Sequence, residues 1–421
     1  MTVLGLLLLI AVLVVLRQSI VIIVALSVAY VHAFMTSKND VEFLIQDVWY
    51  AVDREVLLSI PLFVFAGLIM ARGTIAARLV AIMRALTGPI PGGLGIATVL
   101  ALTVFSAVCG ASSVTMLAIG TLMYPALLQA GYTKRYALGV LCAGGTLGVI
   151  IPPSLLLILY GIATEVSITD LFKAGWGPGL LLAGSLCVYT WLVNRDRPTE
   201  PFLGAQAVQA LRSGIWALLM PVILLGGIYT GWFTVTESAA VAVVYALAVE
   251  LFIHRELKAR DLGAIVLETV KMLGMLMPLL AIAASLNAIL DLQGAPQALV
   301  KAMQQWVGSP AMLLVIVNLV LLVAGALMDE SSAILILAPL LAPMGQAYGF
   351  NPVHFGIIVT VNLQIGYVAP PVALNLIVAM AAFKEPFGLI VRSVMPFILI
   401  MLAVLVVVCA WPPLSLFLLK P

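Results

Sequence analysis

Long apolar runs alternate with short polar segments along the whole chain. The first runs cover residues 3–16 and 19–35, and the last covers about 388–410. A helix needs about 20 apolar residues to cross a bilayer, so the pattern predicts an all-α polytopic membrane protein with about 10–12 transmembrane helices. The first run lacks a basic segment before it and an obvious cleavage site, so we expect a retained span rather than a signal peptide.

Two of the apolar runs are interrupted at their centres. Residues 94–130 are broken at 109–113, and residues 311–347 are broken at 328–332. Each half is short for a complete span, which predicts two re-entrant helical hairpins. A double proline follows each hairpin and predicts broken helices near 136–153 and near 353–371. Such breaks persist in a membrane only where they are buried in protein or line a wet cavity.

The two interruptions belong to a long internal repeat. Three matched pairs share one and the same spacing along the chain: Ser113 and Ser331, Gly148 and Gly366, and Pro152 and Pro370. Pro61 and Pro278 fit the same spacing with a shift of a single position. We therefore predict a first repeat over residues 1–200 and a second over 201–421. Broken helices at matched positions are typical of secondary transporters, and by that analogy the two repeats are expected to be inverted.

The polar segments suggest how the chain meets the membrane surface. Residues 36–56 mix charged and aromatic side chains, which favours an amphipathic segment at the interface. A span from about Val56 is expected to be interrupted by Pro61. The polar loop expected over 194–213 and the segment 254–261 are basic and two crossings apart, so the positive-inside rule places both on the cytoplasmic face.

Composition supports a lipid bilayer as the surroundings and excludes several partners. The chain is 64% hydrophobic and 9% charged, with a mean hydropathy of +1.22, whereas a soluble domain carries roughly 25% charged residues. The net charge of +2 comes without a long basic run, so no nucleic-acid partner is expected. The four cysteines and three histidines are scattered, so we expect no transition-metal site and no cofactor.

The breaks supply groups that bind ions. Each hairpin tip begins a new helix, for which Ser112 or Ser113 and Ser331 or Ser332 are candidate N-caps. Free amides and the helix dipole at such an end favour an anion. The segments 144–153 and 362–371 are expected to unwind and to expose carbonyl oxygens, which suit Na⁺ as the coupling ion. We therefore expect one cation site in each half, with an anionic substrate between them.

Candidate ligands follow from these positions. For the cation they are Ser106, Ser112, Ser113, Gly145, Gly148 and Pro152 in the first half, and Gly325, Asp329, Ser332, Gly366 and Ala369 in the second. For the substrate they are Ser112, Thr115, Ser331, Asn362, Gln364 and Asn375. Glycine, serine and proline clusters are often packing kinks, but the matched duplication favours ion sites here.

Several polar residues also have structural interpretations. Asp329 is a functional candidate because it lies in an apolar run, but it could instead cap the following helix. Glu330 beside it is expected to point elsewhere. Thr234 and Glu237 fit a capping box, and Asn351 followed by Pro352 fits an N-cap with proline at the first helical position.

The same residues resemble the large membrane subunit of the tripartite ATP-independent periplasmic (TRAP) transporters. The matching segments are Ile60 to Gly67, Gly92 to Gly95, Gly110 to Gly120, Gly148 to Ser154, Phe233 to Glu237, Gly325 to Pro339, His354 to Gly356, and Pro370-Pro371. The resemblance covers nearly the whole chain, from about residue 55 to 412. The resemblance implies an elevator-type transporter in the bacterial inner membrane that couples sodium to the uptake of an organic acid anion. It also implies a small four-helix membrane subunit and a soluble periplasmic substrate-binding protein.

The chain departs from the family pattern at a few positions. Ala369 stands where the family usually has a threonine, so a side-chain hydroxyl is missing from the second cation site. We therefore expect the first break to hold the better-formed site. The alternative function is a sodium/dicarboxylate elevator symporter that needs no binding protein. An enzyme is not expected, because Asp329 and Glu330 are the only adjacent acids in an apolar run. A channel is not expected either, because no rings of pore charge are present. Dicarboxylates, keto acids, sugar acids and sulfonates all remain open as substrates.

Overall fold

A computed structural model describes residues 2–16, 18–34, 45–46, 48–50, 53–199 and 201–419. Helices account for nearly all the regular structure in these residues, and no strand occurs among them. The expectation of an all-α chain is confirmed. The amphipathic segment expected over residues 36–56 lies largely outside the described residues.

The N-terminal apolar runs form two separate helices, α1 (Thr2–Val15) and α2 (Ile20–Phe34). A 3₁₀ turn, η1 (Glu55–Leu58), then leads into α4 (Ser59–Arg72). The expected interruption at Pro61 is wrong. Pro61 lies in the first turn of α4, where the backbone amides have no partner within the helix and a missing donor costs little.

Seven helical segments in the described part of the chain are long and apolar enough to cross a membrane, or eight if the bent pair over residues 134–164 counts as one. They include α11 (Ile168–Val193), α12 (Gly204–Thr230), α13 (Val235–Leu247) with the π-helical turn η2 (Ala248–Ile253), and α14 (Ala259–Leu292). This is fewer than the expected 10–12, because the interruptions divide several apolar runs into short helices. The loop expected over 194–213 ends at residue 203, because α12 already begins at Gly204.

Helix boundaries in the two halves correspond closely. The first half contains α5 (Ile75–Thr87), α6 (Gly93–Cys109), α7 (Ser112–Gln129), α8 (Lys134–Gly145), α9 (Leu147–Ile150) and α10 (Leu155–Thr164). The second contains α15 (Ala295–Trp306), α16 (Pro310–Leu327), α17 (Glu330–Ala347), α18 (Pro352–Gly366), α19 (Leu374–Phe383), α20 (Phe387–Ala410) and α21 (Pro413–Leu416). The starts of α7 and α17 are separated by the spacing of the sequence repeat, as are those of α8 and α18. The division into two repeats near residue 200, and their inversion, stay predictions.

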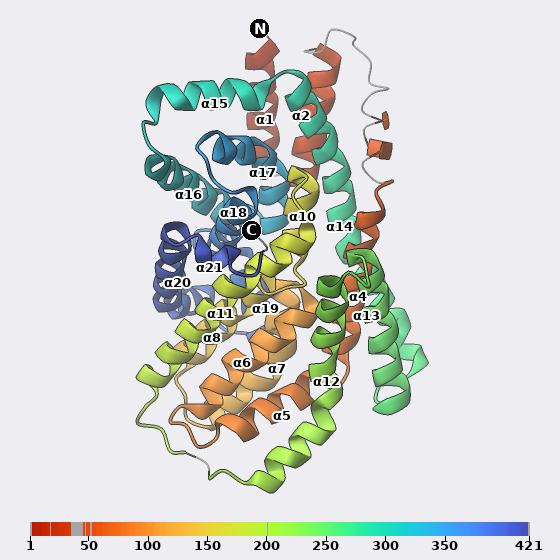
Figure 1. The fold of residues 1–421 in the computed structure, drawn as a ribbon, viewed down its shortest axis with the longest axis vertical. Coiled ribbons are helices and arrows are strands. Elements are labelled where there is room, and N and C mark those ends of the chain that lie inside the picture. The colour runs from red at the N-terminus through yellow and green to blue at the C-terminus, as the bar shows by residue number, and fades with distance from the viewer. Residues whose placement is uncertain are drawn as a thin grey trace.

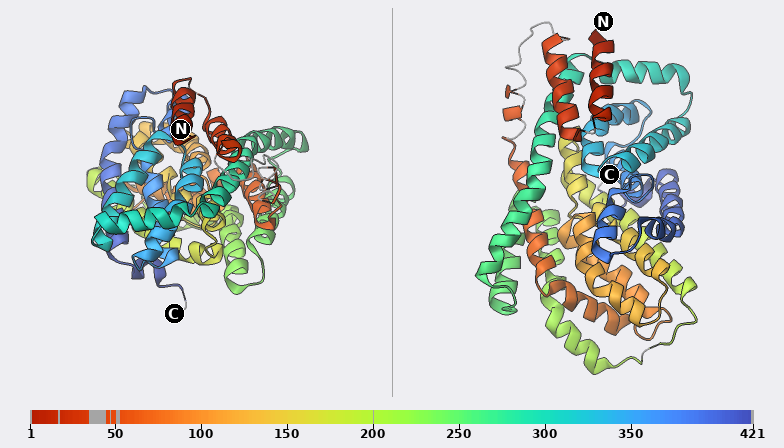
Figure 2. Two further views of the ribbon diagram at one scale, coloured as in Figure 1. Left: turned by 90° about the horizontal axis from the view of Figure 1, so that it is seen from above. Right: turned by 180° about the vertical axis from the view of Figure 1, so that it is seen from behind.

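The helices gather into two groups (Figure 1). One contains α4, α12, α13 and α14, of which α4 packs against α13 and α14. The other contains α6 to α10 and α16 to α20, with α11 packed against α6, α18 and α20. Helices α5 and α15 lie across opposite ends of the molecule, as the right-hand view in Figure 2 also shows. The interrupted elements of both halves thus share one group.

Candidate cation and substrate sites

The first tip (residues 110–113) is held directly against the first break (residues 151–154). Gly110 has a left-handed backbone with φ +62°. Its carbonyl accepts a hydrogen bond of 3.1 Å from the Leu155 amide. A Cβ atom added to Gly110 would lie 2.6 Å from the Pro153 carbonyl oxygen. Glycine is therefore required here both for the backbone conformation and for the close approach of the two segments.

The helix caps at the two tips differ from the expectation. Ala111 is the N-cap of α7 and its side chain makes no capping bond, so Ser112 and Ser113 are the first two helical residues. At the second tip (residues 328–332), Asp329 is the N-cap of α17, and its Oδ2 accepts from the Ser332 amide at 2.8 Å. The predicted serine caps are therefore wrong, and the alternative capping role of Asp329 is confirmed. The extended backbone that a cap requires falls one to three residues earlier than the serines.

The first break is narrower than the predicted unwound segment 144–153. Helix α8 continues through Gly145 and Gly148 lies within α9, so the backbone leaves helical geometry only at Ile151. The glycines instead allow α8 and α9 to approach α7. A Cβ at Gly148 would lie 3.1 Å from both the Ala111 carbonyl oxygen and the Thr115 hydroxyl.

Three hydroxyls on α6 and α7 have no hydrogen-bond partner among the described residues, and that of Thr115 lies beside Gly148. Those of Ser106, Ser112 and Thr115 are buried, with residue exposures of 1% or less. Pro152 also lacks the amide that would pair with the Gly148 carbonyl one turn earlier. Buried polar groups normally have partners, so this set of oxygen atoms fits a hard cation such as Na⁺.

The corresponding groups of the second half bond to one another. Both oxygens of Asp329 accept from Ser332, one from its amide and one from its hydroxyl. The Gly366 carbonyl accepts from the Ala369 amide at 2.9 Å, and Gly325 packs against Gly366 backbone to backbone. The second break covers residues 367–373. It therefore begins five residues later than the predicted unwound segment 362–371 and ends two residues later. Asp329, Ser332 and Gly366 are thus already paired, whereas Glu330 Oε2, Asn362 Oδ1 and Gln364 Oε1 of this half are buried without a partner among the described residues.

A polar cluster joins the first tip to the second break. The Ser113 hydroxyl lies 2.9 Å from the Tyr367 hydroxyl and donates to Asn375 Oδ1 at 3.4 Å. Asn375 Nδ2 donates to the Cys142 carbonyl at 3.4 Å. Ser113 and Asn375 are thus brought together, with Ser113 facing the other half of the chain. Sequence reasoning missed Tyr367, although a phenol directly after the break glycine Gly366 was an available signal.

The remaining predicted substrate residues do not converge equally. Asn362 Nδ2 donates to the side chain and the carbonyl of Asn318 in α16, at 2.6 and 3.0 Å, while its Oδ1 is buried without a partner among the described residues. Gln364 is fully buried, and its amide atoms have no partner among the described residues. Ser331 is half-buried on the first turn of α17.

Glu330 was expected to point elsewhere, and this stays a prediction. Its Oε2 is buried without a hydrogen-bond partner among the described residues. The two structural assignments made elsewhere are confirmed, because Thr234 and Glu237 form a capping box and Asn351 caps α18.

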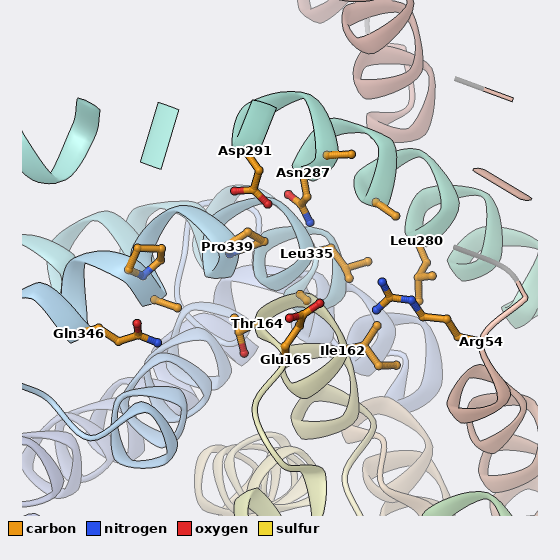
Figure 3. A pocket seen from close by; sticks show the side chains of 15 residues that line it. Arg54, Ile162, Thr164, Glu165, Leu280, Asn287, Asp291, Leu335, Pro339 and Gln346 are labelled. Carbon is orange, nitrogen blue, oxygen red and sulfur yellow. The ribbon is translucent and has the colours of Figure 1, made fainter. Parts of the chain in front are cut away.

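A cavity of about 390 Å³ lies between α10, α14 and α17 (Figure 3). Arg54, Glu165, Asn287, Asp291 and Gln346 contribute its polar lining. In the view of Figure 3, Arg54 and Asp291 approach the cavity from different sides. The cavity was not predicted, because its lining comes from four separated segments of the chain.

Solved structures with a similar fold are membrane transporters. The Alcanivorax borkumensis YdaH transporter superposes with a TM-score of 0.64 at 17% identity, covering 90% of this chain and 89% of that one. Neisseria gonorrhoeae MtrF, described as one of a class of antimetabolite efflux pumps, gives 0.59 at 13% identity, covering 88% and 83%. At these identities the likeness concerns the fold alone.

Residues 6–414 match the family model for the tripartite ATP-independent periplasmic transporter, DctM component. The C4-dicarboxylate TRAP transporter large permease protein DctM of Pseudomonas aeruginosa is 39% identical over 383 residues, 90% of each chain. The ectoine/5-hydroxyectoine TRAP transporter large permease protein UehC of Ruegeria pomeroyi is 34% identical over 384 residues, 90% of this chain and 89% of the relative. The chain belongs to the DctM family of TRAP transporter large permeases, as its motifs suggested. It is a multi-pass membrane transport protein.

Proposed function

We propose that the chain is the permease of a sodium-coupled TRAP system that takes up an organic acid anion across the bacterial inner membrane. A soluble periplasmic protein delivers the substrate, and a small four-helix membrane subunit completes the complex. The observation that carries this proposal is the set of buried hydroxyls of Ser106, Ser112 and Thr115 on α6 and α7, which are unpartnered among the described residues and of which that of Thr115 lies beside Gly148. An apolar environment makes unpartnered polar groups costly, so their presence favours an ion that binds there during the cycle.

The coupling ion binds first in this scheme. Oxygen atoms at the first tip and the Gly148 carbonyl hold Na⁺, and the bound charge keeps the tip and the break together. The carboxylate of the substrate then binds at the N-terminus of α7, where no side chain caps the first amides. Substrate affinity therefore depends on Na⁺, which is the thermodynamic basis of coupling between two sites.

Movement across the membrane follows an elevator scheme. The group of α4, α12, α13 and α14 serves as the fixed scaffold, and the group that contains both tips carries the ion and the substrate. Helix α4 packs closely against the end of α6 next to the first tip. A Cβ atom added to Gly67 would lie only 3.1 Å from the Cys109 Cα. Small residues at such an interface let the two helix backbones approach closely, with no large side chain between them.

Reconstitution tests the proposal. Proteoliposomes that contain the permease and its small subunit are given an inward Na⁺ gradient, with and without the periplasmic binding protein loaded with substrate. We expect uptake only with both Na⁺ and the binding protein. Equal uptake without the binding protein would favour the alternative, a self-sufficient sodium/dicarboxylate symporter. Uptake that persists when K⁺ replaces Na⁺ would refute sodium coupling.

A further inference from the structure

Glu250 is a buried acid that caps a helix other than its own. It lies in the π-helical turn η2, near the end of the apolar span over residues 235–253, and it is fully buried. Its Oε1 accepts hydrogen bonds from the Thr74 and Ile75 amides, at 3.0 and 3.1 Å. These amides lie at the start of α5, whose N-cap Thr74 makes no side-chain capping bond. The carboxyl of Glu250 therefore takes the place of that cap.

The surrounding residues fit this junction closely. A Cβ atom added to Gly73 would collide with the Glu250 carboxyl, so glycine is needed for the approach of the two segments. His254 Nδ1, one turn after Glu250, lies 3.4 Å from the Thr74 hydroxyl and 3.9 Å from Glu250 Oε2. The π-helical turn that presents these two side chains is a rare geometry that occurs often at functional sites.

Helix α5 is bound to α12 as well. Arg78 donates to the Thr74 hydroxyl at 3.2 Å and to the Ser213 carbonyl of α12 at 3.1 Å. One turn further along α5, a Cβ atom added to Gly214 of α12 would lie 2.5 Å from Ile82 Cδ1. The first half of α5 thus contacts two helices of the scaffold, α12 and α13 with η2, and Figure 1 shows α5 beside α12 at that end of the molecule.

Helix α5 also connects the scaffold to the group that contains both tips. It follows α4 of the scaffold and precedes α6, which leads into the first tip. Helix α15 has the same place in the second half, between α14 and α16. Its N-cap Gly294 makes no side-chain capping bond, and among the described residues a Cβ atom added there would meet only Gln297 within 4 Å. The two connecting helices therefore differ, because a buried acid holds the start of the first.

Resting on the proposed elevator scheme, we propose that Glu250 is a positioning residue for transport, which fixes the start of α5 to the scaffold. A buried carboxyl is costly unless donors bind it, and an acid within a membrane span is a functional candidate by default. The amides of α5 are donors for this carboxyl. Helix α5 then stays with the scaffold while α6 to α10 move, and the connection changes its direction after α5 rather than before it.

Spin-label distances test whether α5 is stationary. The permease with its small subunit, its four cysteines replaced by alanine, is placed in lipid nanodiscs and measured by double electron–electron resonance in KCl and in NaCl. The exposed Val222→Cys on α12 is the reference label. It is paired with Leu86→Cys at the far end of α5 or with Gln129→Cys at the end of α7, both exposed. We expect two distances, or a shift between the salts, for the α7 pair and one constant distance for the α5 pair.

Two variants of Glu250 test the role of its carboxyl. In Glu250→Ala we expect several distances for the α5 pair and sodium-dependent uptake that is about tenfold slower. The Na⁺ concentration that gives half of the thermal stabilisation should stay unchanged, because the ion site is elsewhere. Glu250→Gln keeps an oxygen that accepts from the two amides, so it should restore the single distance and most of the uptake. Uptake is followed with whichever of succinate, ectoine and isethionate the wild type transports fastest.

The matched control is Glu237→Ala, which removes a carboxyl cap from the same span. Glu237 caps its own helix α13, so its loss should lower the melting temperature without changing the α5 pair or the uptake rate. If Glu250→Ala behaves like this control, the carboxyl contributes to stability alone and the inference is overturned.

The wild-type distances can refute the inference even if Glu250→Ala fails to fold. If the α5 pair shows the same two distances or the same shift as the α7 pair, α5 moves with the tips and the inference is overturned. One unchanged distance for the α7 pair would instead count against the elevator scheme on which the inference rests. Failure of the inference and failure of the proposed function are thus read from different label pairs.

Discussion

The two halves of the chain build the same tip and break but equip them differently. Around the first tip, α7 has no side-chain cap and the hydroxyls of Ser106, Ser112 and Thr115 are unpartnered among the described residues. At the second tip Asp329 caps α17 and bonds to Ser332, while Glu330 Oε2 has no partner among those residues. At the positions of the second repeat that correspond to Ser106 and Thr115 the chain has Ala324 and Ala333. The same backbone thus carries different polar groups in the two repeats, and this difference is why we propose the ion site in the first.

The outer ends of the two halves show a second difference. Glu385 accepts hydrogen bonds from Lys134 at 2.6 Å and from Tyr124 at 2.9 Å, which ties α7 and α8 to the start of α20. The counterpart of Tyr124 in the second repeat is Ala342, which lines the 390 Å³ cavity instead. The space beside Tyr124 is therefore closed by polar contacts, whereas the corresponding space beside Ala342 is an open cavity.

The largest effect is expected from adding a methyl group at the two break glycines. In Gly366→Ala the new Cβ would lie 2.7 Å from the Gly325 Cα, where only backbone surrounds it, and we expect a loss of about 3 kcal/mol. Gly148→Ala meets its neighbours at 3.1 Å and should lose about 1 kcal/mol. Chemical unfolding in detergent measures both. A larger loss of stability for Gly148→Ala than for Gly366→Ala would contradict the tighter backbone packing between Gly325 and Gly366.

The next largest effect concerns ion affinity at the first tip. Thr115→Val keeps the shape of the side chain but removes a hydroxyl, so we expect the Na⁺ concentration for half-maximal uptake to rise about tenfold. Thr121→Val in the same helix is the control, because that hydroxyl already bonds to the Ala118 carbonyl. An unchanged sodium dependence in Thr115→Val would remove this residue from the site.

A smaller effect is expected at the second tip. Asp329→Ala removes the cap of α17 and should lower the free energy of unfolding by about 1 kcal/mol, whereas Asp329→Ser should restore most of it. Thermal unfolding and sodium-dependent uptake are measured together. If sodium affinity falls in Asp329→Ser while stability is retained, the carboxylate is an ion ligand and the two tips are more alike than their contacts suggest.

The smallest effect concerns the contact of Glu385 with Lys134 and Tyr124. The hydrogen bond from Lys134, followed by that from Tyr124, lowers the pKa of Glu385. Because the folded pKa is depressed, the stabilisation is present above the ordinary carboxyl pKa of about 4.3 and is lost as the pH falls below it. Glu385→Gln should therefore be less stable than wild type by under about 1 kcal/mol at pH 7, and the difference should disappear as the pH falls through the lowered pKa of Glu385. A constant difference across this range would assign the effect to packing.

The positions of the tips and breaks could be predicted from the sequence to within a few residues. Glycine and proline act locally on the backbone, so Gly110, Pro152 and Pro370 mark the ends of helices without knowledge of their neighbours. The serine caps were wrong because a serine such as Ser112 suits a cap in isolation, whereas the backbone path decides which residue takes the extended conformation.

Contacts between the halves could not be predicted. The Ser113 and Tyr367 hydroxyls come from distant parts of the chain, and Asn362 is paired with Asn318 on another helix. Nothing in the local sequence distinguishes the paired Asn362 from Gln364, which follows closely and has no partner among the described residues. Which polar groups lack a partner is a property of the packed molecule.

Helix α14 has a consequence for the membrane itself. Its 34 residues make it about 51 Å long, against a hydrocarbon thickness of about 30 Å. The stretch without charges, residues 272–290, spans about 28 Å and matches the hydrocarbon alone. The earlier part, which holds the 2.6 Å ion pair between Glu268 and Arg72 of α4, then extends into the aqueous layer. Bilayer thickness therefore sets the height of the scaffold, and a thicker membrane would tend to pull this ion pair towards the lipid.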